Sequence, residues 1–191
     1  MSTLKRNRLF CNKIWQSFRF LFLLLERLPK SEICLDLMKL EEKVPDLLLI
    51  NQWIMSRLCS MVLRTNRGLT SYDLHHSTTS LYEFLYGNLC DVYLEGVKPL
   101  SGKDLLESTL VLVKCLEISL RCLTPFMPFL SEELYQRLHF KIASCGIELP
   151  RAESVLVAHY PTEDEVDKSK YFDFDFLSLI NNCSPVGSLE K

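Results

Sequence analysis

The sequence predicts an all-α protein, a helical bundle with one short extended segment and an irregular acidic C-terminal tail. Apolar residues recur at spacings of three and four in several separate stretches, which is the period of helices that bury one face. Breaks with proline or glycine separate these stretches, and only Ser154–His159 resembles a strand. The 191 residues, 48% of them hydrophobic, suffice for one good core and a small appendage. We therefore expect the bundle over residues 1–161 and the acidic tail over residues 162–191.

The first predicted helix runs from Phe10 to Leu25 and carries basic residues beside its apolar side. Pro29 is expected to end it, and residues 29–46 are predicted to form a linker. Seven apolar residues share one side of this helix: Phe10, Ile14, Trp15, Phe18, Leu21, Phe22 and Leu25.

Two further helices should follow the linker. Asp46 is the expected N-cap of the second, which continues to about Asn66. The third is predicted over Ser77–Lys98, where Pro99 closes it because proline cannot continue a helix. Gly87 and Gly96 fall inside this third helix, where each is expected to lower stability by up to about 1 kcal/mol.

The fourth helix is predicted to begin at Ser101, whose spacing to Asp104 resembles a capping box. Two prolines in TPFMPF, residues 124–129, then interrupt the helical pattern. A fifth helix is expected behind Ser131, with the two glutamates that follow it in the first turn, where the helix dipole favours acidic groups.

Charge is distributed unevenly along the chain. Residues 1–30 hold seven Lys/Arg and one acid, whereas residues 150–191 hold four basic groups and eight acids. The basic end favours an anionic partner. A membrane span is excluded there because the apolar run Phe20–Leu25 is six residues long, far short of the roughly twenty needed. A mitochondrial presequence stays open on composition.

No catalytic or metal-binding pattern is present in the sequence. The eight cysteines form no CxxC pair and the four histidines complete no metal pattern, which favours a reducing compartment. Asp91 and Glu95 lie one helical turn apart and form the best carboxylate pair for acid/base work, but carboxylates bonded to a basic group such as Arg57 or Lys98 are the favoured interpretation. His75 and His76 are assigned to a loop without a ligand role. We expect no catalytic residue, metal or cofactor in this chain.

Four blocks stand out in the sequence: RLFCNKIWQSFRF (8–20), NQWIMSRL (51–58), YEFLYGNLCDVYLEGVKP (82–99) and LTPFMPFLSEELYQRL (123–138). In this order and at about these separations, they resemble the anticodon-binding helical domain of valyl-tRNA synthetase, a class I aminoacyl-tRNA synthetase, in its eukaryotic form. The resemblance covers roughly residues 8–161 and implies the helical bundle of that family.

The resemblance places Lys13 and Phe20 at the tRNA anticodon. A lysine offers a charge and three donors to bases or phosphate, and an exposed phenylalanine can stack on an unpaired base. Arg8, Asn12 and Arg19 are weaker candidates for contacts to the RNA backbone, which position without specifying sequence. The alternative is structural, with Phe20 in the core and Lys13 solvated.

The resemblance also indicates what this chain does not do. The family's nucleotide-binding fold, its ATP-handling motifs and its editing domain are absent from these residues, so we expect a fragment, a truncated isoform or a decaying duplicate that is not an active valine–tRNA ligase alone. ATP serves the full-length family and not this chain. The implied partners are valine tRNA and other synthetase-complex proteins, with no membrane, in the cytoplasm or alternatively the mitochondrion. A helical scaffold that binds proteins and not RNA is the alternative function.

Overall fold

The computed structural model describes residues 3–28, 47–146, 151–163, 165 and 166, and its described part is entirely helical apart from turns and loops. The prediction of an all-α bundle is confirmed. The predicted linker and most of the acidic tail lie outside the described residues. The helices are α1 (Thr3–Arg27), α3 (Leu49–Thr70), α4 (Leu74–Tyr82), the π-helix η2 (Glu83–Tyr93), α5 (Leu94–Val97), α6 (Gly102–Leu123) and α7 (Pro128–Ser144). None of these helices combines the length and apolar composition that crossing a membrane requires.

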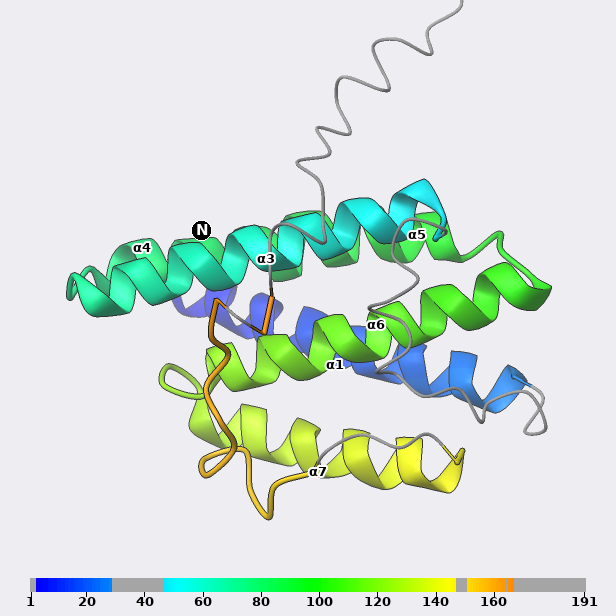
Figure 1. Ribbon diagram of the computed structural model, residues 1–191. Coiled ribbons are helices and arrows are strands. Elements are labelled where there is room, and N and C mark those ends of the chain that lie inside the picture. Colours follow the sequence, from blue (N-terminus) through cyan, green and yellow to red (C-terminus); the bar gives the residue numbers. More distant parts are fainter. Residues whose placement is uncertain (1–2, 29–46, 147–150, 164, 167–191) are drawn as a thin grey trace, which may run out of the picture.

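Helix α6 forms the centre of the bundle. Figure 1 shows α3 lying along α4, η2 and α5 at one side, α6 with α1 behind it in the middle, and α7 at the opposite side. Three consecutive residues of α6, Val111, Leu112 and Val113, are fully buried, so the middle of this helix is enclosed by its neighbours. Helix α1 packs on α6, α7 and η2 with one apolar stripe and leaves its other side uncovered by the described residues.

The third helical segment begins earlier than predicted and contains an unforeseen π-helix. Asp73 caps α4 by accepting a hydrogen bond from the backbone N–H of His76 at 3.0 Å. His75 and His76 therefore lie in the first turn of α4 and not in a loop. The chain then continues without interruption into η2, an 11-residue π-helix. Stretches of π-helix are rare and frequently lie at functional sites.

The predicted start of α6 is confirmed without its capping box, and the predicted start of α7 is wrong. Ser101 is the N-cap of α6, but its side chain makes no capping hydrogen bond, and the left-handed Gly102 (φ +59°) follows it. Helix α7 begins at Pro128, the favoured first position for proline, so Ser131 is buried inside the helix and the glutamates after it lie beyond the first turn. Helix α3 starts at Leu49, and the predicted cap Asp46 lies outside the described residues.

The segment Ser154–His159 is a turn and not the predicted strand. The backbone N–H groups of Val157 and Ala158 both donate to the carbonyl of Ser154, at 3.2 Å. The carboxylate of Glu132 accepts from the Ser154 hydroxyl and the Val155 N–H. The described part of the chain contains no strand with which this segment could pair. Local turns and hydrogen bonds to α7 therefore satisfy its backbone groups instead.

Candidate nucleic-acid interface

The uncovered side of α1 is a polar, largely basic stripe. Residues Lys5, Arg8, Asn12, Gln16 and Arg19 are exposed and recur at spacings of three and four, so they line one side of the helix. We call these five residues the outward stripe. The core-facing stripe lies opposite and consists of Ile14, Phe18, Leu21, Leu24 and Leu25.

The outward stripe contains no acidic residue. The sole acid of α1, Glu26, is bound by Lys141 of α7 at 2.6 Å, and Arg19 makes only a long 3.4 Å contact with the neighbouring Gln16. The cations of the stripe therefore face solvent without an acidic partner among the described residues. Such a surface attracts an anionic polymer through its phosphates.

Lys13 lies on the flank of α1 that faces η2 and is not free. Its ammonium group donates to the carboxylate of Asp91 and lies 3.3 Å from the centroid of the Tyr86 ring, a cation–π contact. Burial alone lowers the pKa of Lys13, but the hydrogen bond and charge of Asp91, together with Tyr86, outweigh it and raise the pKa above its usual value. Lys13 is therefore a firmly charged group.

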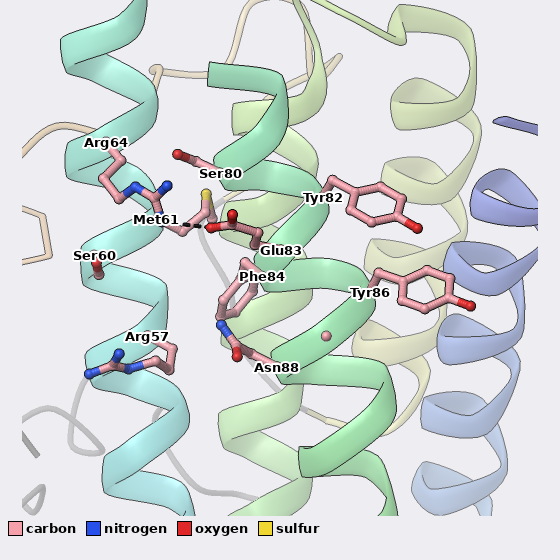
Figure 2. Close-up of a pocket in the computed structure, with 11 residues that line it drawn as sticks. Arg57, Ser60, Met61, Arg64, Ser80, Tyr82, Glu83, Phe84, Tyr86 and Asn88 are labelled. Atoms are coloured by element: carbon pink, nitrogen blue, oxygen red, sulfur yellow. Dashed lines mark hydrogen bonds and ion pairs between the residues drawn. The ribbon is translucent and has the colours of Figure 1, made fainter. Parts of the chain in front are cut away.

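Aromatic rings extend this contact along η2. The rings of Tyr82 and Tyr86 stack with centroids 5.2 Å apart, and Phe10 of α1 lies 5.1 Å from Tyr82. Figure 2 shows Tyr82, the last residue of α4, and Tyr86 of η2 both pointing toward α1. We call Phe10, Lys13, Tyr82, Tyr86 and Asp91 the Lys13 cluster. The tyrosines are not among the residues predicted from the sequence, although their spacing of four in YEFLY places them on one side of a helix.

The five predicted RNA-binding residues occupy two different surfaces of α1. Arg8, Asn12 and Arg19 belong to the outward stripe, whereas Lys13 belongs to the flank. Phe20 follows Lys13 by two helical turns on nearly the same side and is partly buried against the core. The Phe20 ring therefore packs against the core and is also partly exposed to solvent.

The carboxylate pair on η2 and α5 is divided between two lysines. Asp91 bonds Lys13, and Glu95 accepts from Lys98 at 2.6 and 2.7 Å. Each carboxylate thus has its own lysine, as the structural interpretation predicted. The described residues include no cluster of His, Cys, Asp and Glu that could hold a metal ion.

A pocket of about 490 Å³ lies next to the Lys13 cluster, between α3 and the α4–η2 segment (Figure 2). We call it the η2 pocket. Arg57, Ser60 and Arg64 line it from α3, and Arg64 is paired with Glu83 of η2 at 2.8 Å. Tyr86 belongs both to this pocket and to the Lys13 cluster, so the two sites are contiguous. The sequence does not predict the pocket, because its walls come from separate helices whose facing residues are set by packing.

Comparison with known proteins identifies similar chains. Residues 51–183 match the family described as the anticodon-binding domain of tRNA ligase. A valine–tRNA ligase of Caenorhabditis elegans is 36% identical over 167 residues, which are 84% of this chain and 15% of that protein. A valine–tRNA ligase of Fervidobacterium nodosum is 36% identical over 173 residues, covering 90% of this chain and 18% of that protein.

A human mitochondrial valine–tRNA ligase is 38% identical over 164 residues, covering 85% of this chain and 14% of that protein. The chain therefore spans less than a fifth of the length of these three relatives.

Proposed function

This chain belongs to the family of anticodon-binding domains of tRNA ligases, and we propose that it binds tRNA through the outward stripe and the Lys13 cluster. The proposed ligand is valine tRNA, because the relatives named above are valine–tRNA ligases. The observation that carries the proposal is the outward stripe itself, an exposed face of α1 with three cations and no acid.

The two surfaces have different chemical tasks in this proposal. Lys5, Arg8 and Arg19 neutralise phosphates and position the RNA. Lys13 is held over the Tyr86 ring, which stacks on Tyr82, so a donor and aromatic surface lie together, a combination suited to unpaired bases. The partly open face of Phe20 extends the same flank. In a longer ligase, this domain would supply recognition of the tRNA.

A pair of charge reversals on the outward stripe tests the proposal. Arg8→Glu with Arg19→Glu should weaken binding to valine tRNA at least about tenfold and reduce the slope of log affinity against log salt by about two. Lys13 is left unchanged because a glutamate there would face Asp91 and disturb the fold. The matched control, Arg67→Glu with Lys103→Glu, reverses two exposed cations of α3 and α6 that lie off α1.

The measurement is a salt-titrated binding assay with valine tRNA and with the same tRNA carrying replaced anticodon bases. Preference for the unaltered anticodon supports recognition by the Lys13 cluster. Absent or salt-insensitive binding of the unmodified chain to both RNAs would overturn the proposed function.

The second candidate function is a scaffold for protein partners. Phe129 and Phe140 are 91% and 76% exposed. They lie eleven residues apart on α7 and so share one side of that helix. Exposed aromatic residues at this spacing suit a helix-to-protein contact. Partner binding that survives the Arg8/Arg19 reversal but not Phe129→Ser with Phe140→Ser would support this function.

A further inference from the structure

We propose that the η2 pocket is a phosphate-binding site centred on Arg57 and Ser80. As an RNA contact, the site rests on the proposed tRNA-binding function and would hold one backbone phosphate of the bound RNA. The same chemistry could equally hold a free phosphate group, and the experiment below separates these two sources.

The first observation is a cation without an anion. Arg57 lines the pocket from α3 and is half-buried, and its Nε is enclosed without a hydrogen-bond partner among the described residues. No ion pair of Arg57 exists within that part of the chain either. An enclosed guanidinium N–H without an acceptor is unfavourable, so a bound anion would satisfy it.

The second observation is an orphaned hydroxyl in the same pocket. Ser80 is 2% exposed, and its Oγ has no hydrogen-bond partner among the described residues. Figure 2 shows Ser80 and Asn88 on the wall formed by α4 and η2, which faces Arg57, Ser60 and Arg64 on α3. Hydroxyl and guanidinium donors from facing walls are the groups that phosphate oxygens accept from.

The charges in the pocket favour an anion. Arg64 and Glu83 neutralise each other at 2.8 Å, which leaves Arg57 as the uncompensated charge of the lining. The Arg57 guanidinium presents a planar fork that matches phosphate geometry. Gly87 also lines the pocket, and a Cβ built there meets no atom within 4 Å, so the wall beside η2 is open for a ligand larger than phosphate itself.

The location connects this site to the proposed RNA surface. Tyr86 is among the residues that line the η2 pocket, while its ring points away from α3, toward α1 and Lys13. A nucleotide chain that contacts Lys13 would therefore cross η2 at Tyr86 to place a phosphate in the pocket. In this arrangement the η2 pocket continues the α1 surface across η2 toward α3.

The test combines two ligands and four variants of the full chain. NMR spectra of the arginine Nε–H groups are recorded during titration with inorganic phosphate at constant ionic strength, with the Arg57 signal assigned by its loss in Arg57→Lys. Binding to valine tRNA is measured for Arg57→Lys, Arg57→Gln and Ser80→Ala. Lys103→Gln removes an equally sized charge from an exposed position of α6 and serves as the control.

For an RNA phosphate, we expect the Arg57 Nε–H signal to shift with phosphate and with tRNA. Arg57→Lys and Arg57→Gln should each weaken tRNA binding about tenfold, and Ser80→Ala about threefold, whereas Lys103→Gln changes it less than about twofold. The charge-conserving lysine variant separates the fork geometry from general electrostatics.

The remaining outcomes are equally decisive. A shift with inorganic phosphate but unchanged tRNA affinity in the Arg57 variants supports the phosphate site and overturns RNA as its source. If the unmodified chain does not bind tRNA at all, the proposed function fails while the phosphate titration still decides the pocket. No shift of the Arg57 signal with either ligand overturns the phosphate site.

Discussion

Asp91 and the Tyr86 ring hold the ammonium group of Lys13 in place. The family resemblance assigns this lysine to the anticodon, and the structural alternative is a solvated side chain. A fixed cation loses less side-chain entropy on binding, but its carboxylate partner also competes with RNA for the same charge.

Removing the competing carboxylate should strengthen RNA binding. Asp91→Asn is expected to raise the affinity for valine tRNA about threefold at low salt, because Lys13 gains an unshared charge and a nearby negative group disappears. Stability should fall by no more than about 1 kcal/mol, since both partners remain partly exposed. RNA titration and urea unfolding measure the two effects.

Glu95→Gln is the matched control for this prediction, because it removes the carboxylate one turn further along that pairs with Lys98. It should leave RNA affinity within about twofold of the unmodified chain. Weaker binding in Asp91→Asn would show instead that Asp91 positions Lys13 for the RNA and does not compete with it.

At the scale of the element, η2 is the feature that shapes the candidate site. Its buried residues Phe84, Leu85, Leu89 and Tyr93 have spacings that suit an α-helix, and the sequence accordingly predicts one. The structure widens this segment into a π-helix, with Tyr82 and Tyr86 toward α1 and Gly87 in the pocket wall. Because the same spacings fit both helix types, packing against α1 and α3 decides between them.

Substitution by alanine should change stability in opposite directions at Gly87 of η2 and Gly96 of α5. The sequence treats Gly87 and Gly96 alike, as helix positions with a conformational penalty. A Cβ at Gly87 meets nothing within 4 Å, whereas a Cβ at Gly96 would lie 2.1 Å from Cδ1 of Ile50. We expect Gly87→Ala to stabilise the chain by up to about 1 kcal/mol and Gly96→Ala to destabilise it by about 1–3 kcal/mol through overpacking.

Chemical denaturation of both variants decides this prediction. Equal effects would mean that Ile50 moves aside at little energetic expense, and that helix propensity alone governs both positions. Gly96→Ala combined with Ile50→Val should recover part of the lost stability, because Ile50→Val removes the Cδ1 atom that lies in the way.

At the scale of the whole molecule, the segment from residue 151 to 166 forms hydrogen bonds with three helices, α3, α6 and α7. Figure 1 shows it crossing α7 and α6. Glu132 and Gln136 of α7 bind its first part, and Asn66 of α3 donates to the carbonyl of Pro161 at 3.0 Å. Arg121 of α6 donates to the carbonyl of His159 and to the carboxylate of Glu165, both at 3.0 Å.

Arg121 makes the central contacts between α6 and this segment. It also donates to Glu117 one turn earlier on α6, at 2.9 Å, and both side chains are about nine-tenths buried. Burial raises the pKa of Glu117, while the charge and hydrogen bonds of Arg121 oppose that rise. Without the guanidinium, the Glu117 carboxylate would lie buried and unpaired.

Arg121→Gln should therefore destabilise the fold by about 3 kcal/mol, the usual effect of removing one partner of a buried pair. Amide hydrogen exchange should also increase around Val155 and Tyr160. Lys98→Gln, which removes an exposed pair with Glu95, should change stability by less than about 0.5 kcal/mol. Equal stability of the two variants in urea would contradict a structural role for Arg121.

The helical class, the approximate extent of the helices and the family follow from the sequence, because periodic apolar residues and ordered motifs lie along one chain. Only the tertiary structure shows the uncapped first turn of α6, the start of α7 at Pro128, the turn at Ser154–His159 and the π-helix. These features depend on which groups from other segments satisfy the backbone and fill the space beside it.

The same division holds for the candidate site. The sequence alone identified the basic character of the first helix, because charge and helical spacing are local properties. Only the fold brought Lys13 to Asp91 and Tyr86, and Arg57 into the same pocket as Ser80, since these groups lie on different helices. Side chains that meet across helices are set by packing, which no local pattern encodes.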